Sequence, residues 1–218
     1  MFGTNPKRSA ERGDGSILQI QEIFYTLQGE GSFVGMPAVF IRLGGCNLAC
    51  SYCDTEFESF QPMSLVEFMQ QTLSHMPVNA VARPIIVITG GEPLRQPIEP
   101  LCQMLINDGL SVQIETNGSF YRDLPAAGKI ICSPKPGVIG YHMIRDDLMV
   151  RINALKFLVS EHISEYNNVA DIGQSKYGTE VFIQPIDEID AVKNRLNSEL
   201  AVKLAKHFGY RLSLQTHK

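Results

Sequence analysis

Residues 42–56 read RLGGCNLACSYCDTE, and this stretch places Cys46, Cys50 and Cys53 in a CxxxCxxC spacing. Two glycines precede the first thiol and no hydrophobic periodicity is present, so we expect a loop that folds back on itself. Such a loop can present three thiolates to one point. Closed zinc sites and electron-transfer clusters normally use four protein ligands, so three ligands indicate an open coordination position. In a [4Fe-4S] cluster, that position is one iron that binds a small molecule.

Two other interpretations of these cysteines stay open, a zinc knuckle and three unrelated buried thiols, because cysteine spacing alone is not decisive. No CxxC or HxxxH partner elsewhere in the sequence would complete a zinc site. Cys102 lies in a helix-like run and Cys132 ends a strand-like run. A lone cysteine in such a place behaves as a small core hydrophobe, so we expect both to be structural.

The composition is that of a globular protein with a sizeable core. The chain has 218 residues, of which 44% are hydrophobic and 19% charged. Its net charge of −4 argues against nucleic-acid binding, and no apolar run reaches membrane-spanning length. Residues 1–16 carry charges but no apolar core, so we expect a poorly ordered leader, not a signal peptide, before a single domain over 17–218. Without a secretion signal, we expect a cytoplasmic protein with reduced cysteines.

Short apolar runs rich in Val and Ile alternate with longer amphipathic runs, which predicts an α/β fold of mostly parallel strands. The expected strands are residues 17–24, 38–43, 85–89, 112–115, 129–133, 154–159, 181–184 and 211–214. The expected helices are residues 64–74, 96–108 and 187–208. Ser64 and Glu67 match a capping box for the first helix, and Gly109 and Gly209 are placed to end the other two. We place only one strand in the region 138–178.

Glycine-rich or polar motifs follow several of the expected strands. They are YTLQGEG at 25–31, GGEP at 90–93, ETNG at 115–118 and SPKPG at 133–137. Each alone is also typical of an ordinary hairpin loop, strand-to-helix turn, Asn-Gly turn or proline loop. In α/β folds, polar loops at the carboxyl ends of strands form the site. We therefore expect a layer of site residues over a full or partial (modified) TIM-type barrel.

The CxxxCxxC run followed by GGEP resembles the radical S-adenosylmethionine (SAM) superfamily. From about Glu22 onward the chain is similar to one family in it, the 7-carboxy-7-deazaguanine synthases of the queuosine (deazapurine) pathway. The runs that carry this resemblance are YTLQGEG, FIRLGGCNLACSYCDT, ITGGEPL, ETNGS, SPK and LSLQTHK. It implies a lyase that converts 6-carboxy-5,6,7,8-tetrahydropterin to 7-carboxy-7-deazaguanine with ring contraction and loss of ammonia, and that regenerates SAM.

The resemblance also implies the cofactors, which are a [4Fe-4S] cluster, SAM and Mg2+. The implied metal ligands are Cys46, Cys50 and Cys53 for the cluster and Thr55 for Mg2+. The implied SAM contacts are Tyr52, Cys53, Asp54, Gly91, Ser133, Pro134 and Lys135. The implied substrate contacts are Leu27, Gln28, Gly29, Arg42 and Thr89. No side chain is expected to act as the catalyst, since the cofactor carries the radical.

The implied partners are the pterin substrate, a flavodoxin-like or similar reductant and a second copy of the chain in a homodimer, with no nucleic acid and no membrane. The nearest rival is a glycyl-radical-enzyme activase of the same superfamily; a further alternative is a non-enzymatic iron-sulfur or zinc module. The LQGEG, CDT and QTHK elements favour a small-molecule site. Family members carry a few more, mostly apolar, residues after the position of Lys218. If those residues close the substrate pocket, a chain ending at Lys218 is expected to be less active, and His217 is left without an assigned role.

Overall fold

A computed structural model describes residues 5–137 and 140–216. The chain divides into two compact units, and each is described by itself. Unit 1 comprises Met1–Gln28, Gly35–Thr116 and Phe120–Lys129, and unit 2 comprises Gly29–Val34, Asn117–Ser119 and Ile130–Lys218.

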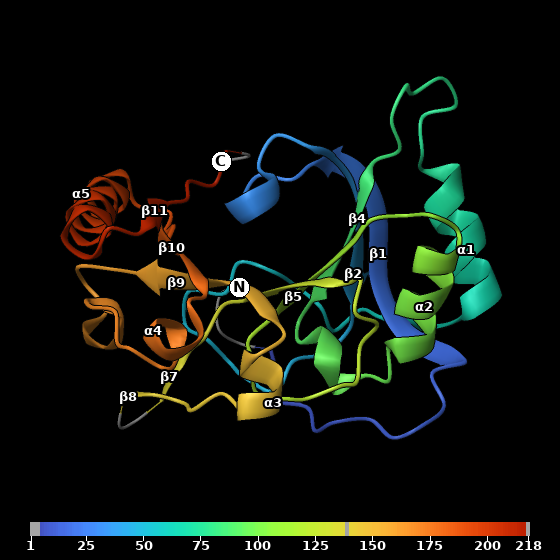
Figure 1. Ribbon diagram of the computed structural model, residues 1–218, viewed down its shortest axis with the longest axis horizontal. Helices are drawn as coiled ribbons and strands as arrows, with labels where there is room; N and C mark the ends of the chain where they lie inside the picture. The colour runs from blue at the N-terminus through green and yellow to red at the C-terminus, as the bar shows by residue number, and fades with distance from the viewer. Residues whose placement is uncertain (1–4, 138–139, 217–218) are drawn as a thin grey trace. The chain divides into compact units, whose positions relative to one another are not determined.

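Unit 1 contains a sheet with the strand order β5-β4-β2-β1-β3. Its elements are β1 (Ile17–Leu27), β2 (Pro37–Leu43), β3 (Gln61–Ser64), α1 (Leu65–Ser74), β4 (Ile85–Gly90), the 3-10 helix η2 (Pro93–Arg95), α2 (Glu99–Asn107) and β5 (Val112–Thr116). Strands β2, β4 and β5 are parallel, whereas β1 is antiparallel to β2 and β3. Helix α1 contacts β1 and β3, and α2 contacts β5. Figure 1 shows both helices on the same side of β1.

The burial of the strands explains this mixture of directions. Residues 85–88 of β4 are all buried, as expected for a parallel strand covered on both faces. Strand β1 instead leaves Ile17 and Leu27 exposed, which suits an antiparallel strand with one open face. The prediction of mostly parallel strands is therefore confirmed; in unit 1 the antiparallel pairs are those of β1 with β2 and with β3. The predicted capping box is present, since Glu67 Oε2 accepts from the Ser64 N–H and Ser64 Oγ accepts from the Glu67 N–H.

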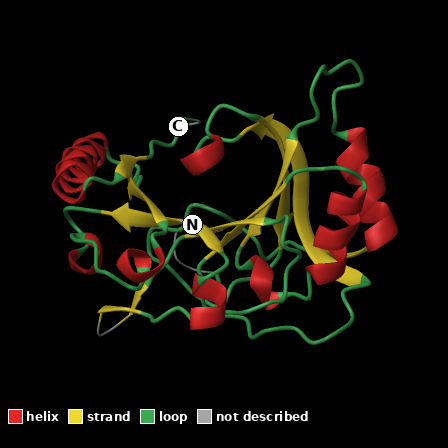
Figure 2. Cartoon of the chain, viewed as in Figure 1, coloured by secondary structure: helices red, strands yellow, loops and turns green. Residues whose placement is uncertain are grey.

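Unit 2 contains parallel strands in the order β11-β10-β9-β6. Its elements are η1 (Gly31–Phe33), β6 (Lys129–Cys132), β7 (Pro136–Gly137), β8 (Gly140–Tyr141), α3 (Asp146–Met149), β9 (Ile152–Val159), η3 (Ser164–Tyr166), α4 (Gln174–Tyr177), β10 (Glu180–Pro185), α5 (Ala191–Phe208) and β11 (Arg211–Leu212). Helix α5 contacts β9, β10 and β11. The short strands β7 and β8 pair antiparallel. Helix α5, drawn as a red coil at the left of Figure 2, has 18 residues and is the longest helix in the described part of the chain.

The differences from the predicted elements have local causes. The third helix begins at Ala191 instead of 187, because the Asp190 carboxylate caps it by accepting from the backbone N–H groups of Val192 and Lys193. It ends at Gly209, whose positive φ of 70° matches the prediction. The region 138–178 holds β8, α3, η3 and α4 besides β9, and each of these is too short to show a periodicity. The last strand covers only Arg211–Leu212.

The α/β class and the mostly parallel strands are confirmed. Within the described ranges, neither unit closes its own strands into a barrel. No helix in the described part of the chain is long and apolar enough to cross a membrane.

Candidate active site

The cysteine loop and the GGEP turn of unit 1 are fastened together by their backbones. Strands β2 and β4 are parallel neighbours, so their carboxyl ends meet at one edge of the sheet. There the Gly91 N–H donates to the Leu43 carbonyl over 3.2 Å, and the Glu92 N–H donates to the Gly45 carbonyl over 3.0 Å. A Cβ on Gly91 would lie 2.1 Å from the Gly45 oxygen and 2.8 Å from the Cys46 nitrogen. Only glycine allows the two motifs to approach so closely.

All five cysteines are thiols, and none is in a disulfide. Cys46 is buried, whereas Cys50 and Cys53 are partly exposed. Burial, with smaller contributions from the nearby Glu92, Cys50 and Cys53, raises the pKa of the Cys46 thiol to about 11, although the hydrogen bond from the Leu48 N–H lowers it. The Cys53 N–H donates to the Cys50 carbonyl over 3.0 Å, which folds this part of the loop into a turn. Cys102 and Cys132 are fully buried, as predicted for structural thiols.

The donor chemistry of this loop fits a cluster held by three thiolates. All three thiols lie within one short loop, in which the Cys53 N–H donates to the Cys50 carbonyl. The side chains are not gathered into a preformed centre, since no group of three or more His, Cys, Asp or Glu side chains within residues 5–137 and 140–216 is arranged to hold a metal ion. Metal ligation requires thiolates, so binding at a thiol with a raised pKa must release a proton.

Residues 5–16, expected as part of a leader, contact the cysteine loop. The Arg8 N–H donates to the Cys46 carbonyl over 2.7 Å, and the Asn5 amide donates to the Thr55 carbonyl over 2.9 Å. Arg8 also forms an ion pair with Glu58 at 2.5 Å. The loop is therefore held both by residues Asn5 and Arg8 and by the GGEP turn.

The predicted substrate contacts of unit 1 lie at two places. Arg42 and Thr89 are register partners on β2 and β4, so the structure brings them together. The Arg42 Nε donates to Glu22 over 2.6 Å, and its NH1 lies 3.5 Å from the Thr55 hydroxyl. Leu27 and Gln28 follow one another at the end of β1, where Leu27 is 56% exposed and Gln28 is buried.

The Gln28 side chain donates to Glu115 Oε1 over 2.9 Å, and Gln113 donates to the same oxygen over 2.8 Å. Glu115, in β5, belongs to the ETNG motif that was predicted to lie in the site, but no ligand contact was predicted for it. Arg95 was not predicted at all; it is 2% exposed and donates to the Gly44 carbonyl over 2.9 Å. The sequence did not predict the burial of Arg95, because an arginine in a short turn is normally expected at the surface.

The predicted SAM contacts fall in both units. Tyr52 and Cys53 are partly exposed, Asp54 is exposed and Gly91 is at the end of β4; these belong to unit 1. Ser133, Pro134 and Lys135 follow β6 in unit 2, where the Lys135 ammonium donates to the Ser133 hydroxyl over 2.7 Å and to its carbonyl over 2.8 Å. Gly29 also belongs to unit 2. His217 lies outside the described residues.

Glu92 is fully buried and has a structural role in the turn. Its Oε1 accepts from the Leu94 N–H over 2.9 Å and from the Thr116 hydroxyl over 2.7 Å. The carboxylate thus caps η2, with Pro93 as the first residue of that helix. The turn that resembles a SAM contact is also an ordinary capped strand-to-helix turn, and the two interpretations describe the same residues.

Comparison with known proteins adds relatives that span the whole chain. The chain is 54% identical over 220 residues to a 7-carboxy-7-deazaguanine synthase of Rickettsia prowazekii, and the match covers 100% of this chain and 94% of the relative. It is 39% identical over 239 residues to a protein of the same name from Rhodospirillum rubrum, covering 100% of this chain and 98% of the relative. The crystal structure of QueE from Escherichia coli is similar with a TM-score of 0.73 at 26% identity, covering 92% of this chain and 95% of that one. No family model matches the chain.

Proposed function

The chain belongs to the 7-carboxy-7-deazaguanine synthase family, and from this premise we propose that it converts 6-carboxy-5,6,7,8-tetrahydropterin to 7-carboxy-7-deazaguanine with loss of ammonia. The observation that carries the proposal is the identity of 54% over the whole chain. The backbone bonds that join the cysteine loop to the GGEP turn support it, because the two motifs of the radical SAM resemblance lie at one sheet edge.

In this proposal the three loop thiolates hold a [4Fe-4S] cluster, and Tyr52, Asp54 and Gly91 contact SAM. The SPK run of unit 2, Ser133–Pro134–Lys135, supplies further SAM contacts, and its ammonium is already oriented by Ser133. When bound, cluster and SAM together supply a radical able to take hydrogen from an unactivated carbon. The protein's own part is to hold the substrate carbon in place and to exclude water.

Arg42 is suited to bind the pterin carboxylate or a ring oxygen through its planar fork. Its NH1 lies 3.5 Å from the Thr55 hydroxyl, the proposed Mg2+ ligand. A guanidinium so close repels a divalent cation, so we propose that Mg2+ joins the site only together with the anionic oxygens of the substrate. Mg2+ affinity should therefore rise when the pterin is present.

The other parts of the proposal concern partners and organisation. A low-potential reductant such as a flavodoxin would supply the electron, and two copies of the chain would form a homodimer in the cytoplasm. We propose that residues 17–218 work as a single radical SAM domain.

The test is the product formed by anaerobic, cluster-loaded protein incubated with SAM, dithionite, Mg2+ and the carboxylated tetrahydropterin. We expect the mass of 7-carboxy-7-deazaguanine in an amount exceeding the SAM supplied. A glycyl-radical-enzyme activase would leave the pterin unchanged and would require a protein partner. An iron-sulfur carrier or zinc module would bind no SAM, so SAM binding separates that alternative.

A further inference from the structure

One face of the unit 2 sheet carries polar side chains where a hydrophobic core would be expected. Lys156 on β9, Gln184 on β10 and Ser213 just after β11 are 5%, 2% and 5% exposed. The parallel register pairs Phe182 with Lys156 and with Arg211, so the alternation along each strand puts all three buried polar residues on the same face. Burying such groups costs free energy unless each is hydrogen-bonded.

These side chains bind the loop that begins at Gly29. The Lys156 ammonium forms an ion pair with Glu30 Oε2, and the Gln215 amide donates to Glu30 Oε1 over 2.8 Å. The Ser213 hydroxyl accepts from the Gly31 N–H over 3.0 Å and donates to Gln184 over the same distance. We call Glu30, Lys156, Ser213 and Gln215 the loop clamp.

The clamp also joins the segment 213–216 to this loop. The Thr216 N–H donates to the Gly29 carbonyl over 3.2 Å. Lys156 and Glu30 are separated by 126 residues in the sequence, and their side chains are 7% and 14% exposed. Residues 29–31 are thereby bound to β9 through Glu30 and to the segment 213–216, and Ser213 in that segment is bound to Gln184 of β10.

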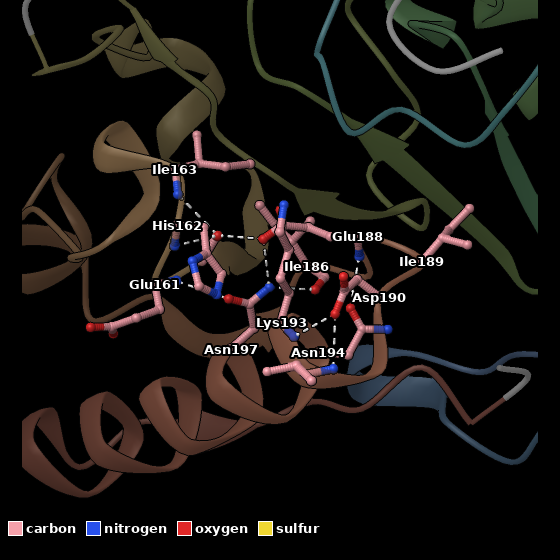
Figure 3. A network of polar contacts seen from close by, with 12 residues as sticks. Glu161, His162, Ile163, Ile186, Glu188, Ile189, Asp190, Lys193, Asn194 and Asn197 are labelled. Atoms are coloured by element: carbon pink, nitrogen blue, oxygen red, sulfur yellow. Dashed lines mark hydrogen bonds and ion pairs between the residues drawn. The ribbon is translucent and has the colours of Figure 1, made fainter.

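A buried ion pair is a poor source of stability, because well-packed apolar residues of the same volume usually serve as well or better. Such a pair does fix one geometry, since moving either group separates two opposite charges that are poorly solvated inside the protein. The contrast within unit 2 is the pair of Lys193 and Glu188 at 3.2 Å, shown in Figure 3. There the lysine side chain is 44% exposed, and Ser160 and Asn197 also bind the Glu188 carboxylate. The position of Glu188 therefore depends little on Lys193.

We propose that Lys156 is a positioning residue for the pterin. Acting through Glu30, it holds the backbone of Gly29 and the segment 213–216 in the arrangement that binds substrate. This inference rests on the proposed function, in which Gly29 contacts the pterin. Lys156 itself need not touch the substrate, because its effect is carried by the Glu30 carboxylate and the loop attached to it.

The first test measures amide hydrogen exchange in the full chain without substrate. In Lys156→Met and in Glu30→Gln, we expect exchange in residues 29–31 and 213–216 to become at least about tenfold faster, because local opening no longer breaks a buried pair. Lys193→Met is the matched control and should leave both segments unchanged. Equal exchange in wild type and the clamp variants, or an increase of the same size throughout the core strands, would overturn the proposal.

The second test measures steady-state kinetics with the cluster-loaded protein. Lys156→Met should raise KM for the pterin by about tenfold with a much smaller change in kcat, because binding and not the chemical step is affected. Glu30→Gln and the double variant should show a similar KM, since both residues act as one unit. An unchanged KM, or effects that add in the double variant, would contradict the inference.

If Lys156→Met does not fold, Gln215→Ala serves as the second variant. Gln215 is only partly buried, so its replacement should not prevent folding. It should speed exchange in the same two segments, and unchanged exchange there would count against the clamp. Failure of the two proposals can be told apart. Wild-type protein that leaves the pterin unconverted defeats the proposed function, whereas active wild type with an unaffected Lys156→Met variant defeats only the clamp.

Discussion

The cysteines of this chain occupy two kinds of surroundings. Cys102 in α2 and Cys132 in β6 are fully buried, whereas Cys50 and Cys53 are partly exposed on a loop. Cys46 lies between these extremes, since it is buried but belongs to the loop. The difference teaches that position in the fold, and not residue type, separates a packing thiol from one that can meet a ligand.

The largest difference between the two groups should appear on cluster loading. Cys50→Ala should abolish the cluster and SAM cleavage, because one iron loses its thiolate. Cys102→Ala is the matched control, and it should cost stability but leave the iron and sulfide content unchanged. A full complement of iron and sulfide in the Cys50→Ala protein would show that Cys50 is not a cluster ligand.

The second prediction concerns the junction that holds the loop in place. In Gly91→Ala the new methyl group would meet the Gly45 backbone, so we expect a cost of about 3 kcal/mol and a loss of most cluster binding. Gly109→Ala is the control, because a Cβ there meets nothing within 4 Å and only the positive φ of 77° opposes it, at about 1 kcal/mol. Chemical denaturation and iron analysis of both variants make the comparison. Normal loading in Gly91→Ala would show that the junction does not organise the loop.

The third prediction uses thiol reactivity in protein without a cluster. Burial raises the pKa of Cys102 to about 12 and that of Cys46 to about 11, so both are protonated at pH 8 and form the reactive thiolate only as the pH rises toward those values. We expect iodoacetamide to modify Cys50 and Cys53 first, Cys46 later, and Cys102 at least about a hundredfold more slowly because it must also be uncovered by unfolding. Peptide mass spectrometry at several times gives the order. Early modification of Cys102 would contradict it.

The smallest expected effect is that of removing the Thr55 hydroxyl from the cysteine loop. Thr55→Ala should weaken the Mg2+ dependence and raise KM for the pterin by roughly tenfold, as loss of one ligand would do, with the cluster intact. Thr72 is the counterpart in the core, since no partner of its buried hydroxyl is present in the described part of the chain. Thr72→Val should leave kinetics unchanged and alter stability by less than about 1 kcal/mol. A Thr55→Ala protein with the wild-type Mg2+ response would rule out Thr55 as a ligand.

Sequence patterns predicted what depends on local periodicity and on short motifs. The buried strand at residues 85–88, the capping box at Ser64 and the end of α5 at Gly209 all follow from neighbouring residues, and all are present. The family resemblance rested on motifs of a few residues each, and relatives spanning the whole chain bear it out.

Contacts between distant segments were not predictable in this way. The pairing of Lys156 with Glu30 and the burial of Arg95 under the cysteine loop depend on which strands become neighbours, and no local pattern encodes that. The direction of β1 was missed for a related reason. Its alternating burial is weak in the sequence, and only its pairing with β2 decides that it is antiparallel.

The central claim is that the loop thiols serve a regenerated cofactor that acts on a small pterin. The most direct measurement follows deuterium placed at C6 of the carboxylated tetrahydropterin, with limiting SAM and cluster-loaded protein. The account predicts product beyond one equivalent of SAM, with deuterium found both in SAM and in 7-carboxy-7-deazaguanine. Stoichiometric loss of SAM with no label returned to SAM or product would contradict it.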